Sequence, residues 1–357
     1  MRLAFYAPMK PPDDPVPSGD RSIARGLVAA LEHLGAEVTL ASRFRSRDGK
    51  GNAEAQAELM AQAAAEITRV TAQGERAGWQ AWLTYHNYYK APDLIGPHVA
   101  AALNIPYLQI ESTRARKRLQ GPWAAFATAA EAASDAARVI FYFTEHDAET
   151  LRRDAPDAQM LIHLPPFLNR DDLPAASDVT GPMLSVGMMR GAAKLPSYRI
   201  IAETLALLPD AGWSLQIAGD GPARPEVEAL MAPFGSKVRC LGALDEPALH
   251  AAYLRSGLLF WPGVDEAFGM VYLEAQAAGL PVVAQNRPGV REVLAGSGHP
   301  APQDGPAALA ARITDLITHP AKRQKAGNAA RQMIQNRHLL PAAASVLRHG
   351  LTEVGVR

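Results

Sequence analysis

The sequence predicts an α/β protein with two doubly wound parallel-sheet domains. Two observations lead to this prediction: short apolar runs alternate with helical segments, and the alternation is interrupted once, at the proline-rich residues 164–182. Parallel strands need a long crossover connection, which a helix usually supplies. The 357 residues are also too many for one ordinary hydrophobic core, so we expect two domains.

The first half begins with a strand, a loop, a helix and a second strand. Residues 3–7 are apolar and precede a loop rich in Pro and Asp over residues 8–19. Apolar residues at helical spacing predict a helix over residues 20–34, which Gly35 ends, and residues 38–41 form the next strand. The same criteria predict a helix over residues 53–72 and strands over residues 81–85, 107–110 and 139–143, with helices between them.

The second half restarts the alternation. It predicts strands over residues 183–186, 214–218, 237–241, 258–261 and 281–284. Helices near residues 197–208, 223–232, 246–255, 270–278 and 305–317 separate these strands. Each half is therefore expected to form its own parallel sheet.

The composition excludes several classes of protein. Lys plus Arg and Asp plus Glu are equal at 36 each, which argues against binding nucleic acid through a basic surface. The single cysteine, Cys240, leaves no disulfide within the chain and favours a cytoplasmic location. No apolar run is long enough to span a bilayer, and the proline at position 8 breaks the only N-terminal candidate for a secretory signal.

Two carboxylates that lie eight positions apart form the most informative motif. Glu266 precedes a Phe-Gly turn, and Glu274 lies in the helix that follows, which ends at Gly279. Such a turn directs free backbone N–H groups and the positive end of a helix toward an anion. Carboxylates accept hydrogen bonds from hydroxyls. Phosphate and hydroxyls bound in one pocket indicate a nucleotide sugar.

This stretch resembles the E-x7-E signature of the retaining glycosyltransferases of family 4, and the similarity extends from Val186 through Glu292. The resemblance implies a GT-B fold, in which two Rossmann-like parallel-sheet domains face a central cleft. Residues 1–175 would then bind the acceptor and residues 176–340 the nucleotide sugar. A helix at about residues 341–357 would cross back to the first domain.

The resemblance also assigns roles around the motif. It implies that Glu274 accepts hydrogen bonds from the ribose hydroxyls and that Glu266 faces the sugar ring. The backbone of Phe268, Gly269 and Met270 would contact the sugar and the phosphates.

Two cations follow the strand that ends at Val186-Gly187. A departing diphosphate gains negative charge in the transition state, and Arg190 and Lys194 could stabilise it. Family members place an arginine where this sequence has Met188, two residues before Arg190. Exposed loop cations are the alternative.

Further donor contacts are expected at the ends of other strands. The resemblance implies that Gly187, Gly219, Leu241 and Leu244 lie around the nucleotide, although a purely structural turn explains Gly219 equally well. Gly19 follows the first strand, where the family has a glycine-rich loop beside the diphosphate. For Ser18 and Asp20, which flank it, we expect helix N-caps.

On the acceptor side, His86 follows the strand over residues 81–85, and Glu111 and Ser112 follow the strand over residues 107–110. Family members often have a histidine near the second position, which this sequence lacks. His86, Glu111 and Ser112 are therefore the candidates for acceptor contacts, with a packed or capping histidine as the alternative for His86.

Two basic clusters occur in the first half, within residues 43–50 and 114–118, the second with Trp123 nearby. Solvated loops explain such clusters in most proteins. The functional alternatives are an anionic acceptor or a weak peripheral contact with a membrane.

The sequence as a whole predicts a retaining glycosyltransferase that moves a sugar from a UDP- or GDP-linked donor to the hydroxyl of a small-molecule or lipid-linked acceptor. We expect no metal and no cofactor, because the chain has no Asp-x-Asp pair and no His/Cys cluster with metal-ligand spacing. Two alternatives remain open: a GT-B epimerase that acts on the nucleotide sugar, and a non-enzymatic binding protein with two lobes.

Overall fold

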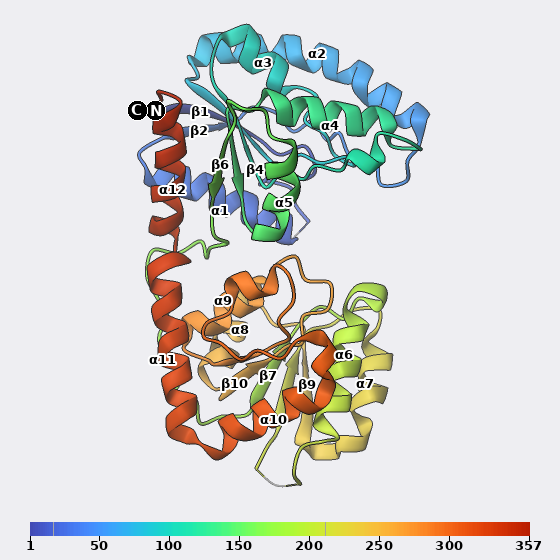
Figure 1. The fold of residues 1–357 in the computed structure, drawn as a ribbon, viewed down its shortest axis with the longest axis vertical. Coiled ribbons are helices and arrows are strands. Elements are labelled where there is room, and N and C mark those ends of the chain that lie inside the picture. The colour runs from blue at the N-terminus through green and yellow to red at the C-terminus, as the bar shows by residue number, and fades with distance from the viewer. Residues whose placement is uncertain (17, 211) are drawn as a thin grey trace. The chain divides into compact units, whose positions relative to one another are not determined.

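The computed structural model describes residues 1–16, 18–210 and 212–357, and the side chains of all of these except residues 192 and 193. Residue 17 of the predicted 8–19 loop is therefore outside the described residues. The chain forms two compact units (Figure 1). Unit 1 comprises Met1–Pro165 and Leu340–Arg357, and unit 2 comprises Pro166–Leu339.

Unit 1 is built on a parallel sheet of six strands in the order β2-β1-β3-β4-β5-β6. The strands are β1 (Arg2–Tyr6), β2 (Glu37–Leu40), β3 (Ala81–Tyr85), β4 (Tyr107–Ile110), β5 (Val139–Tyr142) and β6 (Met160–His163). Every residue of β3, β4 and β5 is buried, as expected where helices cover both faces of a parallel sheet. Trp82 and Phe126 are fully buried in the core.

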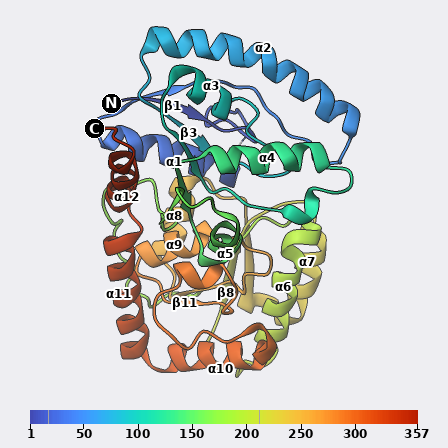
Figure 2. The same ribbon diagram turned by 45° about the horizontal axis from the view of Figure 1, so that its top comes forward.

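The helices of unit 1 are α1 (Gly19–His33), α2 (Ala53–Ala77), α3 (Gly96–Leu103), α4 (Ala124–Ala136), α5 (Glu145–Asp154) and α12 (Leu340–Glu353), with a short 3-10 turn η1 (Arg116–Arg118). Helices α2, α3 and α4 contact one another on one face of the sheet, and α1 packs with α12 on the other (Figure 2). α12 packs closely, because a Cβ at Gly350 would lie 2.4 Å from the Phe141 ring. The C-terminal helix therefore belongs to unit 1.

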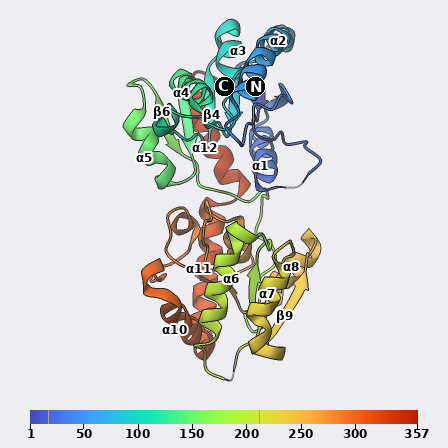
Figure 3. The same cartoon turned by 90° about the vertical axis from the view of Figure 1, so that its right-hand side faces the viewer.

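Unit 2 has a parallel sheet of five strands in the order β11-β10-β7-β8-β9. The strands are β7 (Met183–Val186), β8 (Leu215–Ala218), β9 (Val238–Gly242), β10 (Leu258–Phe260) and β11 (Val282–Val283). The helices are α6 (Gly191–Leu205), α7 (Arg224–Met231), α8 (Glu246–Leu254), α9 (Met270–Ala277), α10 (Gly305–Thr318) and α11 (Pro320–Arg337). Figure 3 shows α6 and α7 side by side.

The strand orders fix where each unit can hold a ligand. In unit 1 the chain reverses direction across the sheet between β1 and β3, and in unit 2 it does so between β7 and β10. Open α/β sheets bind ligands outside the carboxyl ends of the strands at such a switch point. A ligand is therefore expected at the loops after β1, β3, β7 and β10.

The prediction of two parallel α/β domains is confirmed. Among the strands and α-helices that the structure describes, three were not predicted: α5, β6 and α11. The predicted division lies after residue 175, whereas unit 1 ends at Pro165. Unit 1 resumes at Leu340, where the helix expected at about residues 341–357 to cross back to the first domain begins.

Candidate functional sites

In unit 2, a lysine and a carboxylate meet at the switch point. Lys194 lies in the first turn of α6, which follows β7, and Glu266 lies in the loop after β10. Lys194 Nζ donates to Glu266 Oε1 at 2.5 Å, and Trp261 Nε1 donates to the same oxygen at 2.9 Å. The side chains of Lys194 and Glu266 are 19% and 14% exposed, so both remain accessible to a ligand.

The loop that holds Glu266 is packed tightly. Tyr272 donates a hydrogen bond to the Trp261 carbonyl at 3.1 Å, and a Cβ at Gly263 would lie 2.3 Å from the Tyr272 hydroxyl. Asp265 has a φ of +54°, a conformation that is unfavourable for a residue with a side chain. The surrounding packing therefore imposes the position of Glu266.

Glu274 lies in α9, beside a different partner. Tyr253 donates to its Oε2 at 2.8 Å, and the described residues show no hydrogen bond to Oε1. Burial raises the pKa of Glu274 above its ordinary value, although the Tyr253 hydrogen bond opposes this shift. One carboxylate oxygen is thus held in place, and the other is available to a ligand hydroxyl.

Within the described residues, no side chain caps the turn that starts α9. Gly269 is the N-cap, with a φ of +83°, and it provides no side-chain cap. Phe268 before it is buried, and Met270 is the first helical residue. The N–H groups of this first turn therefore lack side-chain acceptors.

The structure does not bring every predicted donor residue into this group. Arg190 is the exposed N-cap of α6, and within the described residues its side chain forms no hydrogen bond or ion pair. Leu241 lies within β9, one residue before its end at Gly242, and Leu244 follows the strand; both are half-buried. Their nucleotide contacts stay predictions.

Two of the predicted glycines have a packing reason. A Cβ at Gly219 would lie 1.9 Å from the Gly187 carbonyl oxygen, and a Cβ at Gly187 would lie 2.6 Å from the Trp261 ring. Close packing at the ends of β7 and β8 explains Gly219, and the Trp261 ring after β10 explains Gly187; donor contact by their backbones stays a prediction.

In unit 1, three titratable side chains meet at the switch point. His86 directly follows β3 and Asp20 lies in the first turn of α1, while Glu111 directly follows β4. His86 Nδ1 lies 3.4 Å from Asp20 Oδ1 and 3.6 Å from Glu111 Oε2. His86 and Glu111 both have a positive φ, +66° and +54°. Backbone strain of this kind is typical of functional sites.

This cluster has unused hydrogen-bonding capacity. His86 Nδ1, Glu111 Oε2 and Ser112 Oγ are buried atoms that form no hydrogen bond within the described residues. Buried polar atoms usually have partners, so a bound ligand is a natural source of the missing ones. The structure thus brings together the three residues that the sequence suggested for the acceptor side.

The charges of the cluster are coupled. Burial lowers the pKa of His86, but Glu111, Asp20 and Asp147 raise it more, and the result lies above the ordinary 6.5. Burial also raises the pKa of Asp20, but His86 lowers it to below its usual range. Burial raises the pKa of Glu111, and His86 offsets only part of that shift. His86 therefore favours its protonated form.

Of the two residues expected to cap α1, Ser18 does so and Asp20 does not. Ser18 is the N-cap of α1 and accepts from Arg21 N at 3.3 Å, as expected. Asp20 does not cap the helix but faces His86, so its expected capping role was wrong. A Cβ at Gly19 would meet open space, so packing does not explain this glycine.

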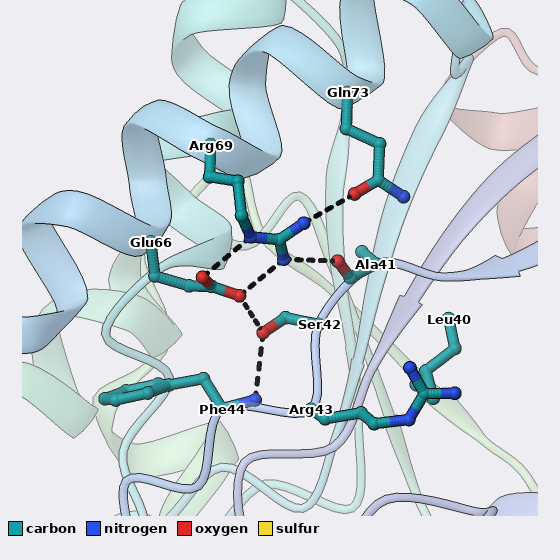
Figure 4. A pocket seen from close by; sticks show the side chains of 8 residues that line it. All are labelled: Leu40, Ala41, Ser42, Arg43, Phe44, Glu66, Arg69 and Gln73. Atoms are coloured by element: carbon teal, nitrogen blue, oxygen red, sulfur yellow. Dashed lines mark hydrogen bonds and ion pairs between the residues drawn. The ribbon is translucent and has the colours of Figure 1, made fainter.

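Unit 1 also has a polar hollow of about 420 Å³ beside β2 (Figure 4). Arg69 donates to Glu66, to the Ala41 carbonyl and to Gln73, and Ser42 donates to Glu66. Because these polar groups bind one another, the hollow offers fewer free donors and acceptors than the His86 cluster. We regard it as a structural network.

Among the described residues, no group of three His, Cys, Asp or Glu side chains is arranged to hold a metal ion. None of the described helices combines the length and the apolar composition that crossing a bilayer requires.

The two units, each with a doubly wound parallel sheet, define the GT-B fold. Sucrose-phosphate synthase from Thermosynechococcus elongatus is similar over 99% of this chain and 98% of its own, with a TM-score of 0.71 and 18% identity. HepE of Anabaena in complex with UDP is similar over 99% of this chain and all of its own, with a TM-score of 0.72 and 16% identity. At these identities the likeness shows the fold alone.

Sequence comparison indicates the class of enzyme. Residues 198–333 match the family described as Glycosyl transferases group 1. Glycogen synthase of Mycobacterium tuberculosis is 32% identical over 167 residues, which cover 43% of this chain and 39% of that protein. The gpi3 subunit of phosphatidylinositol N-acetylglucosaminyltransferase from Schizosaccharomyces pombe is 30% identical over 123 residues, 33% of this chain and 27% of that protein. The matches thus span well under half of these relatives, and they support a glycosyltransferase.

Proposed function

We propose that this protein is a retaining, metal-independent glycosyltransferase of the family 4 type, which transfers a hexosyl group from a UDP- or GDP-linked sugar to an acceptor hydroxyl. Unit 2 binds the donor and unit 1 binds the acceptor. The proposal places the protein in the cytoplasm, where nucleotide sugars are available.

The single observation that supports this proposal most is the contact between Lys194 and Glu266 at the switch point of unit 2. The cation lies where a diphosphate would meet the first turn of α6, and the carboxylate lies where sugar hydroxyls would follow. Helix N-termini favour anions through free N–H groups and the helix dipole. The free oxygen of Glu274 would accept from the ribose.

Catalysis in this proposal is mainly electrostatic. As the bond between the sugar and the diphosphate breaks, charge grows on the diphosphate, and Lys194 and the N–H groups at the start of α9 stabilise it. Glu266 orients the sugar and stabilises positive charge at its anomeric carbon. The acceptor hydroxyl attacks from the face that the diphosphate leaves and passes its proton to the diphosphate, so the configuration is retained.

A donor screen tests the proposal. Thermal unfolding of the full chain is measured with UDP-, GDP- and ADP-sugars, and a ligand at 100 times its Kd should stabilise the fold by about 2.7 kcal/mol. The preferred donor is then incubated with candidate acceptors, and NMR of the product reports its anomeric configuration. Turnover should survive EDTA.

The alternatives predict different results. Conversion of the donor without any acceptor would identify an epimerase. Stabilisation by free sugars but by no nucleotide sugar would point to a binding protein, and an inverted product or loss of turnover in EDTA would overturn the corresponding part of the proposal.

A further inference from the structure

Two cations in unit 1 lie against the same pair of aromatic rings. Lys90 Nζ lies 5.6 Å from the centroid of the Tyr89 ring and 5.4 Å from that of Trp123. The guanidinium carbon of Arg118 lies 5.1 Å and 5.4 Å from the same two centroids. Ring faces attract each cation, but uncharged rings leave both positive charges without a counter-ion. An anion that reaches both cations would neutralise them.

No carboxylate in the described residues provides that anion. Neither Lys90 nor Arg118 forms an ion pair there, and Arg118 Nε is buried without a hydrogen-bond partner. Asp48 contacts this group only through its backbone. Its carboxylate accepts hydrogen bonds from its own loop and from α2, namely from Lys50 N, Gly51 N, Asn52 N and Gln56 Nε2. It has no capacity left for the two cations.

The backbone of three loops fixes the arrangement. Asp48 N donates to the Lys90 carbonyl at 2.9 Å, and Trp123 Nε1 donates to the Asp48 carbonyl at 3.3 Å. The rings of Tyr89 and Trp123 are nearly perpendicular, at 89°, with centroids 5.7 Å apart. These loops follow β2, β3 and β4, so the cations lie at the carboxyl edge of the sheet. The site is therefore formed before any ligand binds.

A row of rings joins this pair of cations to the His86 cluster. The centroids of His86 and Tyr88 lie 4.9 Å apart, and those of Tyr88 and Tyr89 lie 5.6 Å apart. Two ring contacts therefore separate His86 from the ring beneath Lys90. One small molecule of suitable length could reach both places.

We propose that Lys90 and Arg118 bind a phosphate monoester. Such a group carries a charge of about −1.5 to −2 at pH 7, which matches two cations better than a carboxylate does, and the Arg118 guanidinium can donate two parallel hydrogen bonds to it. This part of the proposal rests on the function proposed above. The phosphate belongs to the acceptor, whose hydroxyl enters the pocket of His86, Glu111 and Ser112. Glu111 Oε2 lies 3.6 Å from His86 Nδ1 but forms no hydrogen bond within the described residues, so it can accept one from a hydroxyl.

Isothermal titration of the full chain with inorganic phosphate at constant ionic strength tests the site. Lys90→Gln and Arg118→Gln should each weaken binding at least tenfold. Lys117→Gln is the matched control, because Lys117 is an exposed cation in the same turn as Arg118, and it should bind as wild type does. Phosphate bound near Lys194 is recognised separately, since Lys194→Gln should leave the Lys90 site intact.

Each further outcome decides the proposal. Wild-type protein that binds no phosphate, or Lys90→Gln and Arg118→Gln variants that bind it as wild type does, would overturn it. Circular dichroism shows whether the glutamine variants are folded. If they are unfolded, Lys90→Arg, which keeps the positive charge, is tested in their place, and loss of phosphate binding in that variant would overturn the proposal. Phosphate binding at Lys90 without any nucleotide-sugar binding would preserve the anion site and reject the proposed transferase.

Vesicle flotation distinguishes the two sources of such a phosphate. Flotation with phosphatidylcholine vesicles that contain phosphatidate, lost in Arg118→Gln, would support a lipid headgroup. Absence of flotation together with retained phosphate binding would support a soluble phosphorylated acceptor.

Discussion

Replacing Glu266 by glutamine removes the ion pair of Lys194 but leaves its proposed contact with a diphosphate. The ion pair of 2.5 Å is worth about 7 kcal/mol in raw attraction at an effective dielectric constant of about 20. Desolvation of both groups offsets most of this, and we expect about 1–2 kcal/mol to remain, as in a charge-assisted hydrogen bond. Glutamine keeps an oxygen for the Trp261 indole but releases Lys194 to a diphosphate. Nucleoside diphosphate affinity should therefore rise by a factor of ~5–30, while sugar transfer falls.

Titration calorimetry with UDP and GDP measures the first effect, and turnover at saturating donor measures the second. Glu203→Gln is a matched control, because Glu203 is an exposed residue of α6 whose side chain forms no hydrogen bond or ion pair within the described part of the chain. Both of its readouts should match wild type. Weaker nucleotide binding in Glu266→Gln would show that Lys194 does not meet the diphosphate. Undiminished turnover would show that the Glu266 carboxylate is not needed for sugar transfer.

Three further perturbations follow from the geometry. Glu274→Ala should weaken donor binding by at least ~1–3 kcal/mol, the cost of a lost hydrogen bond to a buried partner, as measured by calorimetry. His86→Gln should lower the free energy of unfolding most between about pH 5 and 6.5, since a raised histidine pKa stabilises the fold below its ordinary value of 6.5 and the gain is lost as pH rises through the folded-state pKa; urea unfolding at several pH values measures this. Gly219→Ala should destabilise the fold by at least ~2 kcal/mol, because its Cβ would lie 1.9 Å from a carbonyl oxygen.

Each of these substitutions has a matched control. Glu203→Ala should leave donor affinity unchanged, and equal losses in both variants would remove Glu274 from the donor site. His98→Gln replaces an exposed histidine and should show no such pH dependence; a pH-independent effect of His86→Gln would contradict the proposed charge coupling. Gly19→Ala, where a Cβ meets open space, should change stability by less than ~0.5 kcal/mol, and a Gly219→Ala variant as stable as this one would refute the packing argument.

Most of the fold could be predicted because its strands are short apolar runs bounded by turn residues. The predicted strands over 81–85, 107–110 and 183–186 match β3, β4 and β7 residue for residue. β6 escaped prediction because Met160–His163 follows a turn closely and is only half-buried at every position. α11 is polar along most of Pro320–Arg337, so it lacks the apolar periodicity on which a helix prediction depends.

The site was harder to predict than the fold. The spacing of Glu266 and Glu274 indicated a pocket, but it gave no sign that Lys194 binds Glu266 directly, because that contact joins loops after two different strands. The role of Asp20 was misjudged for the same reason: local sequence favoured a cap, whereas the strand order brings it to His86. The convergence of Lys90 and Arg118 on two rings depends likewise on three loops that are distant in sequence.

The two units place their charged contacts by the same rule. In each, the contact joins the first turn of the helix after the first strand to the loop after the strand across the switch point: Asp20 to His86 in unit 1, and Lys194 to Glu266 in unit 2. Near each contact, residues with side chains adopt a positive φ, namely His86 and Glu111 in one unit and Asp265 in the other. Such residues cost about 1–2 kcal/mol each where glycine would cost little. Because glycine would avoid most of this cost, an imidazole and carboxylates at these positions favour the hypothesis that the two sites use their chemistry.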